Sequence, residues 1–344
     1  MVVTLRDVAQ AAGVSSATAS RALDPKASAD PKTRVRVRRA ADRLGYSGNS
    51  VARTLRTSRS QTIGLLVPDV RNSFFTDLAY AVDKTAAEAG FTVMMGNADE
   101  DGAAQDRYLE ALVRHQVDGL LFVPQGEASD TLRRAVARQP TVCLDRDPGL
   151  GLPVVASESR SGMHELVDHI VALGHRRIAV VSGPLTTSTG RDRLAATRER
   201  LAHHGLLLPE EYVVEGDFQP ASGAAAARRL LAAAGVPQVV IAADAAMGQG
   251  VLAVLRSRGL AVGADVGVAA FDDNPWFEML EPPVTAVAQD IEELGRGAVR
   301  ALLDGIDGRP MGTRLVPTRL VVRRSLGEPA QNPTSRPTKE LTHE

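Results

Sequence analysis

Apolar runs alternate with helical patterns from residue 62 to about residue 327. Short, fully apolar runs predict buried strands at residues 63–67, 92–96, 119–123, 141–144, 178–182, 213–215, 239–242 and 266–271. Between them, apolar positions recur with helical spacing at residues 76–89, 104–115, 162–173, 191–204, 222–234 and 247–258. This alternation predicts parallel sheets covered by helices on both faces. The units are too numerous for one ordinary sheet, so we predict two α/β lobes in series.

The first 23 residues follow a different pattern, that of two short helices joined by a tight turn. Apolar residues recur at i, i+3, i+4 and i+7 over residues 5–12, and Thr4 stands where it can cap the first helix. Gly13 ends that helix, and Ser15 can cap the second. Small and polar side chains then point outward from the second helix, namely Ser16, Ala17, Ser20 and Arg21. Such a surface suits a helix that lies in a DNA major groove, although an ordinary helical hairpin is the alternative.

A third helix is predicted over residues 31–44. Asp30 stands at the cap position and Pro31 at the first helical position, which together make a strong start signal. Its buried stripe would close a small three-helix core over the first two helices. Its arginines remain outside, namely Arg34, Arg36, Arg38, Arg39 and Arg43.

Charge is distributed unevenly along the chain. Residues 1–60 hold 12 Lys and Arg against 4 Asp and Glu, a net charge of +8, whereas the remaining residues hold 28 against 37, a net charge of −9. Neutralisation of phosphates by Lys and Arg is the sequence-independent part of DNA affinity. A basic head on an acidic body therefore favours DNA binding by the first 60 residues. Because only 4 of the 40 basic residues are Lys, codon bias can explain the preference for Arg, but not its clustering.

Several longer stretches support DNA binding by the first 60 residues, because their sequences and their order along the chain match those of one protein family. They are TLRDVAQAAGVSSATASRAL at 4–23, TR at 33–34, LGY at 44–46, NSVARTLRTSRSQTIGLLVP at 49–68, ALGHRRIAVVSGP at 172–184, GRDRLAA at 190–196, VGVAAFDD at 266–273 and PPVTAVAQD at 282–290. The chain resembles the lactose-repressor (LacI/GalR) family of bacterial transcription regulators over roughly residues 2–327.

The resemblance implies an α/β chain with an N-terminal all-α helix-turn-helix head and a two-lobed periplasmic-binding-protein-like core of two doubly wound parallel sheets. It places the head at 1–46, a hinge helix and linker at 47–60, and the effector-binding core at 61–327. Within the core, lobe 1 would comprise about 61–157 and 289–317, and lobe 2 about 158–288 and 318–327. Residues 328–344 are rich in Pro and Thr and read as a disordered tail. The tail has no leucine heptad of the kind that makes tetramers, so we expect a homodimer.

By the same resemblance, the DNA contacts come from the head and the hinge. The expected residues are Thr4, Ser15, Ser16, Ala17, Thr18, Ser20, Arg21, Thr33, Arg34, Asn49, Ala52, Arg53 and Leu55. Leu55 falls where the family wedges a leucine into a minor-groove step. The hinge is too short to be a stable helix alone, and a plain linker rich in Ser and Arg is the alternative. Gly48 stands where the family often has proline, so we expect the hinge to be more flexible than in most family members.

In proteins with open parallel sheets of this kind, the ligand binds beyond the carboxyl ends of the strands. In a chain with two such lobes, we expect this site to be the cleft between them. The residues expected to bind a small-molecule effector there are Phe74, Phe75, Asp145, Arg193, Phe218, Asp272 and Gln289. Aspartates that only cap turns and phenylalanines that only fill the core are the alternatives. The sequence departs from the family pattern at Ala243-Asp244 and at Glu158-Ser159. The identity of the effector therefore cannot be inferred from that of the lactose repressor.

The sequence holds little that indicates catalysis. His164-Glu165 followed by His169 resembles a zinc motif, but the second His is five residues on and is turned about 140° away. No phosphate-binding or dinucleotide-binding glycine motif and no nucleophile elbow occurs, and Cys143, the single cysteine, lies in an apolar run. We therefore expect neither an enzyme, a cofactor nor a metal site.

Taken together, these features predict a cytoplasmic, homodimeric repressor that binds a near-palindromic double-stranded DNA operator. A small effector, expected to be a sugar or sugar derivative, would control its operator affinity from the cleft. No apolar run reaches the ~20 residues of a membrane span, and no signal-peptide pattern opens the chain. A solute-binding protein or a non-catalytic sugar-binding module is the alternative function.

Overall fold

The structure is a computed structural model that describes residues 3–24, 27–46, 59–126, 128–232 and 236–327. The chain divides into two compact units between Gln61 and Thr62. Most of the predicted hinge, including Asn49, Ala52, Arg53 and Leu55, lies outside the described residues, as does the predicted tail. The remaining hinge residues, Arg59 and Ser60, lie in no regular element.

The first unit, called the head below (residues 3–46), consists of three helices: α1 (Leu5–Ala12), α2 (Ser16–Leu23) and α3 (Pro31–Leu44). Thr4 and Asp7 form a reciprocal capping box at the start of α1, with the Thr4 backbone N–H 2.8 Å from the Asp7 carboxylate. Gly13 ends α1 with a φ of 63°, a conformation that favours glycine. Eight small apolar side chains form the core of the head: Val8, Ala9, Ala12, Ala19, Ala22, Val37, Ala40 and Ala41.

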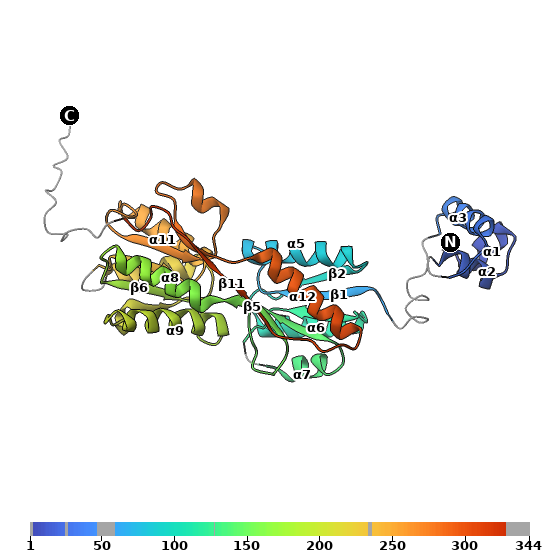
Figure 1. Cartoon of the computed structure of the whole chain (residues 1–344), viewed down its shortest axis with the longest axis horizontal. Helices are drawn as coiled ribbons and strands as arrows, with labels where there is room; N and C mark the ends of the chain where they lie inside the picture. Colours follow the sequence, from blue (N-terminus) through green and yellow to red (C-terminus); the bar gives the residue numbers. More distant parts are fainter. Residues whose placement is uncertain (1–2, 25–26, 47–58, 127, 233–235, 328–344) are drawn as a thin grey trace, which may run out of the picture. The chain divides into compact units, whose positions relative to one another are not determined.

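The second unit contains two six-stranded sheets, each the centre of one lobe (Figure 1). In lobe 1 the strand order is β11-β5-β4-β3-β1-β2, and all pairs are parallel. The bounds are β1 (Thr62–Val67), β2 (Thr92–Asn97), β3 (Gly119–Phe122), β4 (Thr141–Leu144), β5 (Val154–Glu158) and β11 (Arg314–Pro317). Helices α5 (Ser73–Glu88) and α12 (Ile291–Ile306) cover one face, and α6 (Gly102–Arg114) and α7 (Asp130–Val136) cover the other.

In lobe 2 the strand order is β12-β10-β9-β8-β6-β7, with β12 the one antiparallel strand of its sheet. The strands are β6 (Ile178–Ser182), β7 (Val213–Glu215), β8 (Val239–Ala242), β9 (Gly267–Phe271), β10 (Thr285–Ala288) and β12 (Arg319–Val321). Helices α8 (Ser159–Ala172) and α9 (Ser188–His203) pack on one face, and α10 (Pro220–Ala232) and α11 (Ala245–Ser257) on the other. Two short 3₁₀ helices, η1 (Glu210–Tyr212) and η2 (Pro275–Met279), complete this lobe.

Each sheet separates two hydrophobic cores because its strands point successive side chains to opposite faces. In β1, Ile63, Leu65 and Val67 belong to the core under α5 and α12, whereas Leu66 belongs to the core under α6 and α7. All four are fully buried. This double burial explains why the central strands read as continuous apolar runs, and it confirms the predicted fold class.

The chain passes between the lobes three times, between β5 and α8, between β10 and α12, and between β11 and β12. Four strands (β5, β10, β11 and β12) were not among those predicted from apolar runs. Strand β11 buries one side chain of four, Val316, and β12 buries none fully, so neither presents an apolar run. These late, short strands return the chain to each sheet.

Candidate functional site

Residues that follow strands of both sheets line one small cavity between the lobes. Its volume is about 10 Å³, roughly the room that one water molecule needs. The lining residues are Asn72, Phe74, Phe75, Asp145, Arg146, Thr189, Arg193, Phe218, Asp244 and Asp272. Because polar and aromatic side chains from both lobes converge here, we call these ten residues the interlobe cleft.

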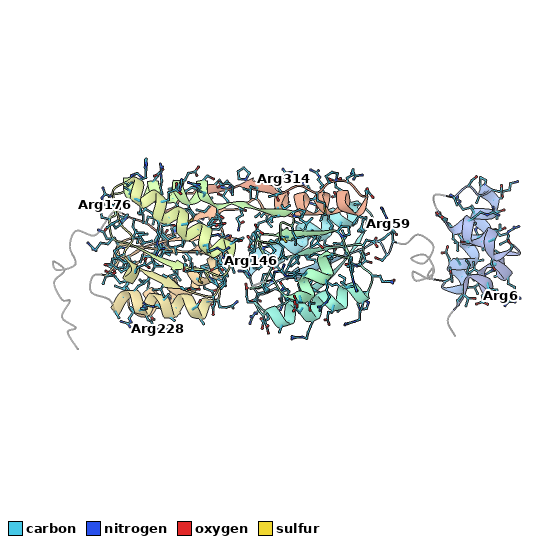
Figure 2. All side chains as sticks on the ribbon, turned by 90° about the horizontal axis from the view of Figure 1, so that it is seen from below. Arg6, Arg59, Arg146, Arg176, Arg228 and Arg314 are labelled. Atoms are coloured by element: carbon cyan, nitrogen blue, oxygen red, sulfur yellow. The ribbon has the colours of Figure 1, made fainter. Side chains whose placement is uncertain are left out.

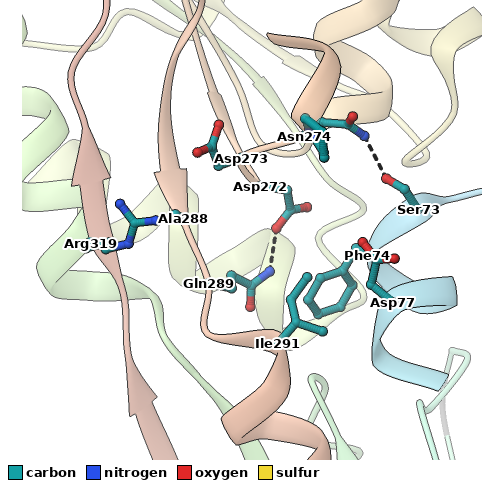
Figure 3. Close-up of a pocket in the computed structure, with 11 residues that line it drawn as sticks. Ser73, Phe74, Asp77, Asp272, Asp273, Asn274, Ala288, Gln289, Ile291 and Arg319 are labelled. Carbon is teal, nitrogen blue, oxygen red and sulfur yellow. Dashed lines mark hydrogen bonds between the residues drawn. The ribbon is translucent and has the colours of Figure 1, made fainter. Parts of the chain in front are cut away.

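A second cavity of about 110 Å³ adjoins the cleft and shares Phe74 and Asp272 with it (Figure 3). Its polar wall is ordered by hydrogen bonds. Gln289 donates from its amide nitrogen to Asp272 and accepts from the hydroxyl of Ser157 with its amide oxygen. Gln289 is therefore held in the wall of the second cavity by residues on both sides of it.

The backbone around the cleft adopts an unusual conformation at several strand ends. Residues with positive φ that are not glycine occur after β4 (Asp145, 59°), after β7 (Phe218, 62°) and after β9 (Asp272, 69°). Two more, Asp99 (52°) and Glu100 (55°), follow β2. The left-handed region costs free energy for a residue with a Cβ, and such residues cluster at functional sites. Three of these five residues line the cleft, and Glu100 binds a fourth lining residue, Arg146.

Arg146 is the most buried cation of the cleft, with 3% of its surface exposed, and it lies where the two lobes meet (Figure 2). Its guanidinium donates to both carboxylate oxygens of Glu100 at 2.8 Å and to the side-chain oxygen of Gln125 at 3.1 Å. Its Cζ atom lies 5.0 Å from the ring centre of Phe218 and 5.9 Å from that of Phe75. Burial lowers the pKa of Arg146, but the bonds and charge of Glu100 raise it more, so the side chain stays cationic.

Arg193 extends from α9 toward the cleft. Its guanidinium donates to the backbone oxygen of Ala243 at 2.7 Å and lies 3.9 Å from the carboxylate of Asp145. The Cζ atom stacks 3.6 Å from the ring centre of Phe271. Its Nε atom is buried and has no hydrogen-bond partner among the described residues, as is true of the Nε atom of Arg146. Each is a donor that a ligand could satisfy.

Two aspartates of the cleft have raised pKa values. Burial raises the pKa of Asp244 to about 7, against the hydrogen bond from the Met247 backbone N–H, and the neighbouring charge of Asp272 raises it further. Burial raises the pKa of Asp272 to about 6, against the attraction of Arg193 and the bond from Gln289. The Asp145 carboxylate completes an acidic wall. Carboxyl groups of this kind bind ligand hydroxyls, as acceptors when ionised and also as donors when protonated.

Hydrogen bonds between side chains or backbone connect the lobes across the cleft. They run from Gln219 to Asp69 (2.9 Å), from Asn72 to Asp244 (3.4 Å), from Asn274 to Ser73 (2.6 Å) and from the Asp147 backbone to Ser188 (2.9 Å). All these partners stand at strand ends or helix starts. These polar contacts therefore hold the two lobes together beside the cleft.

The structure brings six of the seven residues expected from the sequence to the cleft: Phe74, Phe75, Asp145, Arg193, Phe218 and Asp272. Gln289 lines the adjoining cavity. Sequence reasoning missed Asn72, Arg146 and Thr189, and it treated Asp244 only as part of a departure from the family. Arg146 carried a usable signal, because it directly follows Asp145 at the end of an apolar strand.

In the head, Ser15 caps α2 by accepting from the Thr18 backbone N–H at 3.2 Å, and their hydroxyls are hydrogen-bonded at 2.9 Å. Ser16, Ala17 and Arg21 are exposed on α2. The other residues of the head that are expected to contact DNA are accessible in part or in full, namely Thr4, Thr18, Ser20, Thr33 and Arg34. Ser16, Ala17 and Arg21 therefore belong to the solvent-exposed surface of α2.

Arg34 also has a structural role, because its guanidinium donates to the carbonyl of Ala27 in the loop before α3. The Thr33 backbone N–H donates to the Asp30 carboxylate at 2.8 Å, so Asp30 caps α3 as expected. The predicted contacts at Thr33 and Arg34 thus lie on the first turn of a well-capped helix.

Comparison with known proteins agrees with both units. Residues 4–49 match the family described as "Bacterial regulatory proteins, lacI family", and residues 167–326 match the "Periplasmic binding protein-like domain". The ribose operon repressor of Halalkalibacterium halodurans is 33% identical over 337 residues, which cover 96% of this chain and 99% of that protein. The chain belongs to the LacI family.

Solved structures of LacI-family proteins share its fold. A crystal structure of the lac repressor dimer bound to operator and the anti-inducer ONPF is 29% identical, covers 95% of this chain and 100% of its own, and gives a TM-score of 0.86. A complex of the transcriptional regulator CelR with cellobiose is 34% identical, covers 94% and 99%, and gives a TM-score of 0.71. As a LacI-family member, this chain is a DNA-binding transcriptional regulator with a periplasmic-binding-protein-like core.

Two further features concern membranes and metals. Within the described ranges, no helix has the length and apolar character needed to cross a membrane. In the same part of the chain, no three His, Cys, Asp or Glu side chains are grouped so that they could hold a metal ion.

Proposed function

We propose that this LacI-family chain is a transcriptional repressor whose affinity for its operator is set by a small polyhydroxylated effector bound in the interlobe cleft. One observation supports this most directly: a single cavity is lined from both lobes by aromatic rings, carboxyl groups and two arginines whose Nε atoms have no hydrogen-bond partner among the described residues. Ring faces stack on the apolar face of a sugar, and carboxyl and guanidinium groups bind its hydroxyls.

DNA binding belongs to the head in this proposal. Ser16, Ala17, Ser20 and Arg21 of α2 face base edges in the major groove, and Lys and Arg of the head neutralise phosphates. Since Ser and Ala side chains make few hydrogen bonds to bases, DNA shape contributes much of the specificity. Two heads of a homodimer read the halves of a near-palindromic operator, and the predicted hinge at 47–60 connects each head to its core.

The cleft supports coupling because its walls belong to different lobes. A ligand that contacts Asp145 of lobe 1 and Arg193 of lobe 2 binds the closed arrangement more tightly than an open one. Such differential affinity is what allows an effector to shift a conformational equilibrium. Two of the named relatives, the ribose operon repressor and the lac repressor, are repressors, and no turnover of the effector is proposed.

Thermal unfolding in the presence of a panel of neutral sugars, sugar acids, phosphosugars and nucleosides tests the effector site. We expect one class to raise the Tm of the wild-type chain and to leave Arg193→Ala unchanged, because Arg193 supplies a buried donor to the ligand. Arg198→Ala is the matched control, since Arg198 lies on the same helix but is exposed and pairs with Glu210. Loss of the shift in the control as well would contradict a contact at Arg193.

A second titration tests the link to DNA. Operator fragments selected from random DNA by the full-length wild-type chain are titrated with and without the ligand found above. The proposal expects the ligand to change operator affinity several-fold. A ligand that binds the cleft but leaves DNA affinity unchanged would favour a plain sugar-binding module.

A further inference from the structure

A groove on lobe 1, separate from the interlobe cleft, is lined by three arginines. It lies between α6 and α7 and encloses about 220 Å³. Its lining residues are Glu110, Val113, Arg114, Thr131, Arg134, Ala135 and Arg138. None of them follows the carboxyl end of a strand, and none contributes to the cleft. We call this hollow the α6–α7 groove.

Helical spacing explains why the arginines converge. Thr131, Arg134 and Ala135 recur at i, i+3 and i+4 on one face of α7, and Arg138 follows in the turn after the helix, where its backbone N–H donates to the Ala135 carbonyl at 3.0 Å. Glu110 and Arg114 stand one turn apart on α6, which packs against α7. The two sets of residues therefore face the same hollow from opposite sides.

The three arginines of the groove form few strong ion pairs within the protein, so most of their positive charge is not neutralised. Arg114 lies 3.9 Å from Glu110, in a pair whose side chains are 70% and 54% exposed, and such pairs contribute little. Among the described residues, Arg134 donates only to the hydroxyl of Thr131, at 3.0 Å. The Arg138 side chain has no hydrogen bond or ion pair with any described residue. The groove thus carries three guanidinium groups against one carboxylate.

This local charge stands out against its surroundings. Residues 61–344 carry a net charge of −9, whereas the groove has a net charge of +2. A helix C-terminus attracts cations, which accounts for Arg114 in the last turn of α6 and for Arg133 and Arg134 in the last turn of α7. It does not account for three guanidinium groups, from two helices, that line one hollow.

We propose that the α6–α7 groove binds a small organic phosphate, with the phosphate held by Arg114, Arg134 and Arg138. A net charge of +2 matches the dianion of a phosphate monoester, and the guanidinium fork pairs bidentately with phosphate oxygens. Val113 and Ala135, which pack against the core beneath, provide an apolar floor for the organic part. The volume is below that of drug-sized pockets and suits a ligand of a few carbon atoms. This second site does not depend on the proposed function of the cleft.

Isothermal titration of the full-length chain with phenyl phosphate at low ionic strength tests the site. We expect saturable binding of one phenyl phosphate per chain, in the millimolar range or tighter. The double variant Arg134→Ala/Arg138→Ala should weaken it at least about tenfold, because two of three charge-assisted contacts are removed. Glu110→Gln should strengthen it, since the one carboxylate of the groove is neutralised.

Arg133→Ala is the matched control, because Arg133 is exposed on α7 but does not line the groove. Its affinity should stay within about twofold of the wild-type value. Equal losses in Arg133→Ala and the double variant would reveal diffuse attraction to a basic surface and overturn the proposal. Absence of saturable binding to the wild-type chain would do the same.

Two further measurements separate phosphate binding in the groove from binding of any anion and from binding at the head. Benzoate carries one carboxylate on the same ring, and binding as tight as that of phenyl phosphate would overturn the assignment to phosphate. The basic head also attracts phosphate, so binding that persists fully in Arg134→Ala/Arg138→Ala would place the ligand there and overturn the groove site. Thermal unfolding of each variant without ligand confirms that these exposed substitutions leave the fold intact.

Discussion

Single residues around the cleft hold one another in place with little free space. Phe218 has a φ of 62° and lays its ring over Gly183, where a Cβ would lie 2.2 Å from the ring's Cζ atom and 2.3 Å from its Cε1 atom. The Phe218 ring in turn stacks on Arg146. The absence of a side chain at position 183 therefore sets the position of an aromatic wall of the cleft.

Gly183→Ala should push the Phe218 ring away from the cleft and weaken effector binding roughly tenfold or more, the usual result of overpacking a tight site. Titration with the ligand that stabilises the wild-type chain measures the loss. Gly312→Ala is the control, because a Cβ there meets nothing within 4 Å. Unchanged affinity in Gly183→Ala would show that Phe218 does not contact the effector.

The raised pKa of Asp244 has a consequence for stability. The folded chain holds this proton up to about pH 7, whereas an unfolded Asp releases it near pH 4. Between these values the folded state binds more protons, so the free energy of unfolding falls as the pH rises. Asp244→Asn removes that loss and keeps the cap of α11, because Asn is also a good N-cap residue.

We expect Asp244→Asn to gain stability relative to the wild-type chain between about pH 4 and pH 7, by more than about 1 kcal/mol at the upper end. Urea unfolding at several pH values measures the difference. A difference that stays constant with pH would contradict the raised pKa.

Pairs of helices pack closely where glycines bring their backbones together. A Cβ at Gly250 of α11 would lie 2.0 Å from the Pro220 carbonyl oxygen of α10, and one at Gly223 would lie 2.1 Å from the Met247 carbonyl oxygen. Backbone atoms cannot move aside as a flexible side chain can. The contact between α10 and α11 therefore requires both glycines, and Phe218 lies just before α10 in the chain.

Gly250→Ala should destabilise the chain by about 1–3 kcal/mol or more, because α10 and α11 must separate. Gly248→Ala offers a matched control on the same helix, since its Cβ would meet the nearest atom at 3.4 Å. There the better helix propensity of Ala should leave stability unchanged or raise it by up to about 1 kcal/mol. Chemical unfolding compares the two, and equal effects would contradict the close approach.

Whether a strand or helix could be predicted from the sequence depended on how it is buried in the fold. Strands such as β1 and β8 are buried on both faces and gave continuous apolar runs, and α3 had both a Pro start and a Gly stop. Strands β11 and β12 lie at sheet edges and mix charged with apolar residues, so their pairing depends on distant partners. The place of Arg146 in the cleft was not predicted from the sequence for a similar reason, because its burial depends on an ion pair with Glu100, 46 residues away.

At the scale of the whole molecule, charge is segregated between the head and the rest of the chain. The head and the linker up to residue 60 carry +8, and the remainder carries −9. Attraction to DNA is therefore concentrated in a small part of the chain, while the acidic remainder repels the phosphate backbone. Operator binding should depend strongly on salt as a result.

We expect operator affinity to fall at least about tenfold between 50 mM and 200 mM salt, because each neutralised phosphate releases condensed counterions. Fluorescence anisotropy with a labelled operator measures the slope. Effector binding in the cleft should change much less over the same range, since its ionic groups are buried. A flat salt dependence of DNA binding would contradict the role of the basic head.

The three passages between the lobes also determine the order in which the chain can be completed during synthesis. Lobe 1 needs α12 and β11, which follow every strand of lobe 2 except β12. The head, by contrast, is finished within the first 46 residues. Because domains fold as they leave the ribosome, the head emerges complete long before the sheet of lobe 1 gains its last strand. A nascent or truncated chain that stops short of β11 thus carries a finished DNA-binding head on a core in which β5 is left as the edge strand of lobe 1.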